Sequence, residues 1–183
     1  MAAIGCDISL GGVLKAKRFA EEKGVQDLTY FVVCSAERLP FKDAAFHKMS
    51  SVHVLEHLYD DIAAVAEIGR VVRDRAFISV PNTYYRMWPI FWLPYYIHDK
   101  RIGHLRHYSE KDLVTKFSGA SFRCTHVHYS GHLVKFLQFF LAKLLRVENK
   151  QDSWLWWKLE NADLNSGHFP FALTLNCTFA RAS

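Results

Sequence analysis

Residues 36–58 have the sequence AERLPFKDAAFHKMSSVHVLEHL, and this stretch decides the fold. A proline and charged residues near its start predict a turn, and the apolar run at 45–54 predicts a buried β-strand. The run ends among polar side chains, His53, Glu56 and His57. In parallel α/β sheets ligands bind beyond the carboxyl ends of the strands, so this end of the strand is a candidate site.

The segments on either side alternate between strand and helix patterns. Ser9 can cap a helix that ends near Gly24, and Asp60 or Asp61 can cap a second helix. Strands are predicted at residues 2–7, 28–34, 45–54 and 75–80. This alternation predicts an α/β fold with a mostly parallel sheet.

The helix after residue 60 has a predicted buried side. Its apolar residues define the inward face and its charged residues the outward face. The predicted inward residues are Ile62, Val65, Ala66 and Ile68, and the predicted outward residues are Glu67 and Arg70.

The second half of the chain is less regular. An aromatic insertion occupies residues 84–108, Ser109 can cap a helix reaching about Phe117, and residues 133–146 have an amphipathic helix pattern. Strands are predicted at residues 122–129 and 171–180. The insertion and the amphipathic helix indicate an apolar or lipid-linked ligand or a membrane surface, or else they cover the sheet as a lid and a packing helix. Charged residues and prolines interrupt both before the length of a membrane span.

The composition predicts one globular domain over residues 1–183, with 50% hydrophobic and 22% charged residues. The net charge of +5 comes from scattered basic residues, which indicates a solvated surface, with a phosphate-binding face as the alternative, and argues against a nucleic-acid partner. The four cysteines have no CxxC spacing, and the N-terminus has no secretory pattern. We therefore expect a cytoplasmic protein without disulfides.

Three segments carry a resemblance to a known family. They are IGCDIS at 4–9, the stretch at 36–58 with its LPF turn and VLEHL motif, and RVVRDRAFISVPN at 70–82 followed by GHLRHYSEKDL at 103–113. Together they resemble the class I S-adenosylmethionine-dependent methyltransferase family, with a type 11-like domain. The resemblance implies a Rossmann-like, mostly parallel sheet that ends in an antiparallel C-terminal edge hairpin.

The resemblance implies that S-adenosylmethionine is the cofactor. The implied cofactor-binding residues are Asp7, Ile8, Ser35, Ala36, Glu37 and His53. Asp7 ends the first predicted strand, where a carboxylate can accept hydrogen bonds from both ribose hydroxyls, although a turn or helix-capping role is the alternative. Ser35 stands where related sequences commonly have aspartate, and a serine bonds the adenine amino group more weakly.

Methyl transfer needs a base only if the acceptor is a neutral hydroxyl or amine. The catalytic candidates are His57, His104 and Tyr84, with His107 beside them, and the sequence does not separate them. For His57 the alternative is a histidine that ties a loop to the backbone. His104 and His107 lie in GHLRHYS, which we expect to be structural with a lid role as the alternative.

No metal site is expected from the spacing of potential ligands. His126 and His128 share one strand face, but no cysteine or carboxylate falls at metal spacing beside them.

A complete family member also has a first strand and a GxGxG turn, whose backbone NH groups approach the methionine carboxylate. The sequence has no such turn. The resemblance places the first strand between the second and fourth, so its loss separates them by roughly 9.6 Å, two strand spacings. The chain could pair these strands directly, borrow a strand from another chain, or be a fragment of a longer product, which we favour.

Three functions are compatible with these observations. The first is a methyltransferase acting on a small-molecule or lipid-linked acceptor, with activity residing in the complete parent protein. The second is a catalytically silent methyltransferase-fold module that binds another protein. The third, a nucleic-acid-modifying enzyme, is disfavoured because residues 80–83 read VPNT rather than an NPPY-like tetrad. The sequence does not specify the oligomeric state.

Overall fold

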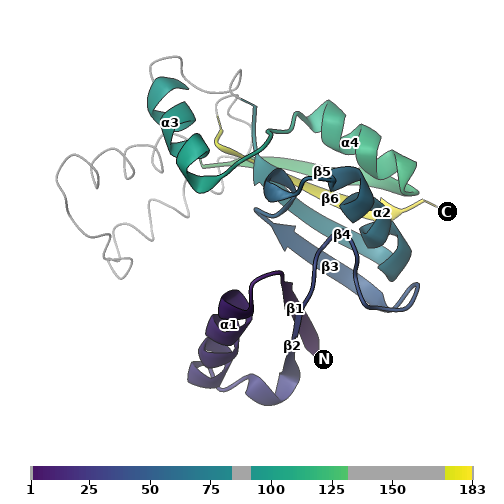
Figure 1. The fold of residues 1–183 in the computed structure, drawn as a ribbon. Helices are drawn as coiled ribbons and strands as arrows, with labels where there is room; N and C mark the ends of the chain where they lie inside the picture. The colour runs from purple at the N-terminus through teal and green to yellow at the C-terminus, as the bar shows by residue number, and fades with distance from the viewer. Residues whose placement is uncertain (1, 84–91, 132–171, 183) are drawn as a thin grey trace.

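The computed structural model describes residues 2–83, 92–131 and 172–182, as Figure 1 shows. Tyr84, the first part of the aromatic insertion and the predicted helix at 133–146 lie outside the described residues. The described chain forms two sheets. One is a pair with the order β1-β2, and the other has four strands in the order β3-β4-β6-β5.

The smaller unit consists of β1 (Ala3–Asp7), α1 (Leu10–Glu22) and β2 (Thr29–Val33), with a 3-10 turn, η1 (Gln26–Leu28), before β2. The two strands run parallel, as a crossover through a helix requires. Ser9 caps α1 as predicted, since its Oγ accepts from the Gly12 NH at 3.3 Å. The helix ends before Gly24, whose positive φ of 69° suits a glycine that reverses the chain.

The larger sheet joins parallel and antiparallel strands. β3 (Phe46–Val52) pairs in parallel with β4 (Val72–Pro81). β6 (Thr174–Arg181) lies between β4 and β5 (Phe122–Ser130) and is antiparallel to both. This arrangement confirms the predicted α/β fold with a mostly parallel sheet and an antiparallel C-terminal hairpin.

Helices α2 (Asp61–Val71) and α4 (Glu110–Gly119) cover one face of the larger sheet, as Figure 1 shows. The core lies between them and the sheet, where Phe117 of α4 stacks on Phe179 of β6 with ring centroids 4.2 Å apart. Asp60 caps α2 by accepting from the Ala63 NH, and Ser109 forms a capping box with Asp112. The local start signals in the sequence therefore place both helices correctly.

The buried side of α2 differs from the prediction. Val65 and Ile68 are buried as expected, but Ile62 is 66% exposed and Ala66 is also exposed. Asp61, Ala64 and Gly69 are buried instead. The buried face of α2 is rotated relative to the prediction for two reasons. Asp61 accepts a hydrogen bond from the Tyr108 hydroxyl, and Gly69 lies against Ala120, where a Cβ at position 69 would be 3.0 Å from the Ala120 Cβ. Charge pairing and backbone contact outweigh the apolar pattern here.

The aromatic insertion contains a helix that the sequence did not predict, α3 (Trp92–Ile102). None of the described helices combines the length and the hydropathy needed to cross a bilayer. The four cysteines are all free thiols, as predicted. Cys6, on β1, is exposed.

The strand pairing tests whether β1 and β3 pair directly in place of the first strand that the family has and this sequence lacks. Within the described residues β1 pairs with β2 and β3 pairs with β4, and no ladder joins β1 to β3. The chain therefore does not close the gap by pairing the second and fourth strands of the family pattern. Each of these two strands keeps one edge whose NH and CO groups have no strand partner in the described chain.

The smaller unit should be much less stable locally than the larger sheet. Ala20 is the one buried residue of α1, whereas Leu14, Phe19 and Tyr30 remain exposed. Little apolar burial supports its hydrogen bonds, so they should open by local unfolding. We expect amides of β1 and β2 to exchange at least about 100-fold faster than those of β4 and β6 in native-state hydrogen exchange. Equal protection of the two sheets would contradict this prediction.

Candidate functional site

The first group of predicted site residues lies at the carboxyl ends of β1 and β2. Asp7 is the last residue of β1, and its carbonyl accepts from the Cys34 NH at 3.0 Å, just after β2. Its Oδ1 accepts from the Ser9 NH at 2.7 Å. Gly12 lies so close that a Cβ there would be 2.8 Å from Asp7 Oδ2. Asp7 is exposed, so one carboxylate fixes the turn into α1 and also faces solvent.

The neighbouring residues have different local roles. Ile8 is 74% exposed, which leaves an apolar side chain uncovered beside the Asp7 carboxylate. Ser35 forms a turn in which its Oγ accepts from the Glu37 NH at 3.1 Å. Ala36 packs against the core, and Glu37 Oε1 accepts from the Asp60 NH at 3.0 Å. Glu37 thus holds the loop before α2 in place. The resemblance implied a cofactor contact for Glu37 and did not indicate this structural role.

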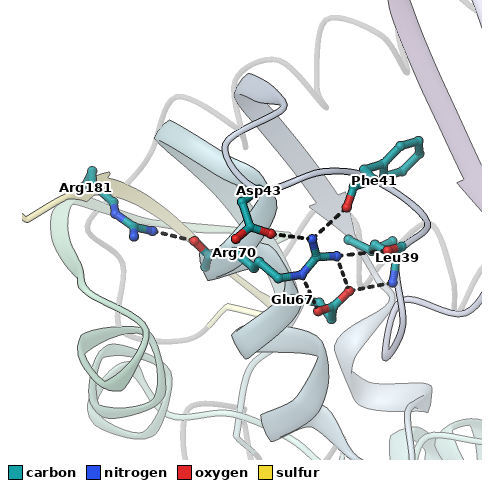
Figure 2. A network of polar contacts seen from close by, with 7 residues as sticks. Leu39, Phe41, Asp43, Glu67, Arg70 and Arg181 are labelled. Atoms are coloured by element: carbon teal, nitrogen blue, oxygen red, sulfur yellow. Dashed lines mark hydrogen bonds and ion pairs between the residues drawn. The ribbon is translucent and has the colours of Figure 1, made fainter.

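Arg70 of α2 holds the loop that contains the LPF segment, as Figure 2 shows. Its guanidinium donates to the carbonyls of Leu39 (2.9 Å) and Phe41 (2.6 Å) and to the Asp43 carboxylate (2.8 Å). It also bonds Glu67 in a bidentate manner at 2.7 and 2.8 Å, and this hydrogen bonding lowers the pKa of Glu67. The LPF loop is therefore positioned by a helix-borne arginine through its backbone.

The second group lies at the end of β3. His53 has a positive φ of 52°, a strained conformation for a residue other than glycine. Its NH donates to the Ser79 carbonyl at 2.9 Å, and its Nδ1 lies 2.9 Å from Glu56 Oε1. The VLEHL motif then forms a 3-10 turn, η2 (Leu55–His57). This backbone geometry turns Glu56 inward and leaves His53 half exposed.

The segment at 103–108 closes over η2. The Leu105 NH donates to the Glu56 carbonyl at 2.9 Å, and His57 Nδ1 lies 3.3 Å from the Gly103 carbonyl. His104 Nδ1 lies 2.6 Å from Asp99 of α3, and His107 Nε2 lies 2.6 Å from the other oxygen of Asp99. Burial outweighs this carboxylate and lowers the pKa of His104. Two motifs that are distant in the sequence therefore form one cluster of histidines and carboxylates.

Arg106 and Tyr108 have structural partners, as the sequence predicted for GHLRHYS. Arg106 and Lys116 pair with Asp61 at 2.8 and 3.1 Å, and the Tyr108 hydroxyl donates to Asp61 Oδ2 at 2.7 Å. Burial would raise the pKa of Asp61, but these hydrogen bonds and positive charges outweigh it and lower that pKa. Burial and the Asp61 charge raise the pKa of Tyr108. An open hollow of about 640 Å³ lies beside these side chains.

The structure thus sorts the predicted residues into two places. Asp7 and Ser35 lie at the ends of paired strands, whereas His53, His57 and His104 gather around Glu56. Tyr84 lies outside the described residues. The sequence placed Glu56 at this strand end without assigning it a role, and it did not single out Asp99. A signal for Glu56 was present, since an acid between two histidines in HVLEH is a potential ligand, but Asp99 gave none.

Two sequence comparisons agree with this geometry. Residues 1–80 match the family model described as "Methyltransferase domain". Over 80 residues the chain is 36% identical to the uncharacterized methyltransferase YcgJ of Bacillus subtilis (strain 168). That alignment covers 43% of this chain and 31% of YcgJ, so the matched part spans less than a third of the curated relative.

Solved structures share the fold across nearly the whole chain. The [4+2]-cyclase SpnF superposes with a TM-score of 0.67 at 18% identity, covering 100% of this chain and 67% of SpnF. The Bacillus YcgJ crystal structure gives 0.61 at 18% identity, covering 100% and 83%. A geranyl diphosphate methyltransferase in complex with S-adenosylmethionine gives 0.64 at 15% identity, covering 99% and 69%. At these identities the likeness establishes the fold.

The described strand order and the polar strand ends define a Rossmann-like methyltransferase fold. The match over residues 1–80 supports the S-adenosylmethionine-dependent methyltransferase family that the sequence motifs resemble.

Proposed function

We propose that this chain contributes the adenosine-binding and acceptor-facing parts of a methyltransferase that acts on a small or lipid-like acceptor. The observation that carries the proposal is the exposed Asp7 carboxylate at the carboxyl end of β1, beside the Ser35 turn that follows β2. This is the edge at which ligands of open parallel sheets bind, and a carboxylate there suits two ribose hydroxyls.

The residues present fit the adenosine part of S-adenosylmethionine. The exposed Ile8 offers an apolar contact, and Asp7 offers acceptor oxygens beside it. The glycine at position 12 leaves room for this carboxylate, since a Cβ there would lie 2.8 Å from Asp7 Oδ2. The sequence contains no GxGxG turn to approach the methionine carboxylate of the cofactor. The described chain therefore offers no glycine loop for the methionine half of the cofactor.

When bound, the cofactor supplies a methyl group already activated on a sulfonium. The chain then has to align an acceptor with that methyl group and exclude water. His57 and His104, gathered at the end of β3, are the described candidates for the acceptor side of the site. Removal of a proton from the acceptor by His57, His104 or Tyr84 is a prediction.

An apolar acceptor, or contact with a membrane surface, is supported by the described part of the aromatic insertion. Tyr96, Ile97 and Ile102 of α3 and the nearby Leu105 are exposed. One structural neighbour is named for geranyl diphosphate, an isoprenoid substrate. The four free thiols suit a cytoplasmic location.

The proposal predicts that Asp7→Ala loses cofactor affinity. Calorimetric titration of the chain with S-adenosylhomocysteine should give saturable binding, and Asp7→Ala should weaken it at least about 30-fold, because a charge-assisted pair of hydrogen bonds is lost. Asp7→Asn keeps an oxygen for the Ser9 NH and separates the turn role from ligand binding; we expect it also to bind weakly. Asp27→Ala, in η1 before β2, is the matched control and should bind normally.

The second candidate, a silent module used for protein binding, predicts the opposite result. The missing glycine turn and the serine at position 35 favour it. No binding heat from the wild-type chain, with a folded far-UV spectrum, would reject the cofactor-binding proposal for this chain and favour the silent module.

A further inference from the structure

The cluster around Glu56 has the composition of a metal site. One potential ligand atom from each of Glu56, His57 and His104 lies within 4.8 Å of the other two. His104 Nε2 and Glu56 Oε1 are 3.9 Å apart, too far for a hydrogen bond between them. An imidazole pair and a carboxylate are ligands that divalent transition metals prefer.

Glu56 is the least expected member, because it is 0% exposed. Its Oε1 is paired with His53, but its Oε2 is buried and has no hydrogen-bond partner among the residues that the structure describes. A buried carboxylate oxygen without a donor costs stability, so a compensating cation is the simplest physical reason for its position. This unpartnered oxygen is an observation independent of the spacing of the ligands.

Both histidines are oriented as metal ligands commonly are. His104 Nδ1 is held by Asp99 at 2.6 Å, and His57 Nδ1 is near the Gly103 carbonyl at 3.3 Å. In each case the remaining Nε2 is left for another partner. A carboxylate or carbonyl behind the imidazole fixes its tautomer and direction in known metal sites. Gly103 has a positive φ of 79°, which suits a glycine at this point.

We propose that Glu56, His57 and His104 bind a divalent transition metal ion such as Zn²⁺, with Asp99 and Gly103 orienting the two histidines. Asp99, His104 and His107 also lie within ligand distance of one another, but both Asp99 oxygens already contact histidines. Asp99 is therefore the outer partner. Three protein ligands leave one coordination position for water or an acceptor oxygen. The inference departs from the expectation of no metal site and does not rest on methyl transfer.

The test is metal binding by the full chain after removal of metals with a chelator. Titration with Zn²⁺ by calorimetry, and with Co²⁺ by visible absorption, should give one tight site per chain with a tetrahedral Co²⁺ spectrum. Glu56→Gln should weaken binding more than about 100-fold, and Asp99→Asn about 10–100-fold, as an outer partner does. Wild-type affinity in Glu56→Gln would overturn the proposal.

A matched control is available on β5. His126 and His128 stack with ring centroids 6.5 Å apart and offer an alternative pair for adventitious binding. His126→Gln/His128→Gln should retain the tight site, and its loss there would overturn the proposal. Thermal melts guard against misfolding: with chelator present, Glu56→Gln should be at least as stable as wild type, because a buried charge is removed. Zn²⁺ should raise the melting temperature of the wild type but not that of Glu56→Gln, and an equal rise in Glu56→Gln would also count against the site.

Discussion

Phe179→Ala should lower the free energy of unfolding by about 3–5 kcal/mol, the range for truncating a buried phenylalanine. Phe179 is 0% exposed in β6, the strand between β4 and β5, and stacks on Phe117 of α4. Its removal leaves a cavity at the point where the sheet meets the helix layer. Urea denaturation followed by far-UV circular dichroism measures the change.

Phe77→Ala is the matched control for this prediction. Phe77 lies on β4 between the buried Ala76 and Ile78, so its side chain points to the opposite face of the sheet, and it is 39% exposed. We expect its removal to cost no more than about 1 kcal/mol, since less apolar surface is lost from burial. Equal losses in the two variants would mean that the core does not lie on the α2–α4 side.

Asp61→Asn should lower the free energy of unfolding by about 2–3 kcal/mol, because it removes the charge that Arg106 and Lys116 pair with in a nearly buried position. Asp61 is 4% exposed and also accepts from the Tyr108 hydroxyl. This loss is smaller than the roughly 3–5 kcal/mol of a fully buried pair because both cations keep part of their contact with water. Chemical denaturation at pH 7 measures it.

The pH dependence provides a second measurement for Asp61. Burial opposes ionisation, but the hydrogen bonds and charges of its partners prevail and lower the folded-state pKa. The stabilisation is therefore complete above the unfolded-state pKa of about 3.9 and is lost as the pH falls through the folded-state value. As the pH falls, the free energy of unfolding of Asp61→Asn should decrease less steeply than that of the wild type. The decrease that is due to Glu67, whose pKa is also lowered, should persist in the variant.

Asp74→Asn is the control for the charge change. Asp74 pairs with His47 on the surface at 2.7 Å, with both side chains about half exposed or more. Solvent screens such pairs, so the variant should differ from wild type by less than about 1 kcal/mol. A loss as large as that of Asp61→Asn would contradict the assignment of Asp61 as a buried anchor.

The helix starts and the strands of the described chain were predictable because their signals are local. Ser9, Asp60 and Ser109 each cap the helix that follows them. The inward face of α2 was not predictable, because Asp61 is drawn inward by partners more than 40 positions away in the chain, and Gly69 by Ala120. Apolar periodicity carries no information about such partners.

The sequence alone predicted the order of the strands and of the helices α1, α2 and α4, the polar residues at the strand ends and the resemblance to methyltransferases. Each depends on residues within a few positions of one another. The tertiary structure decided that β1 and β3 do not pair, and that VLEHL and GHLRHY form one cluster. His57 and the Gly103 carbonyl lie 46 positions apart, and Asp99 comes from a helix that the pattern did not indicate. Such contacts depend on how packed layers place distant backbone segments, which local preference does not encode.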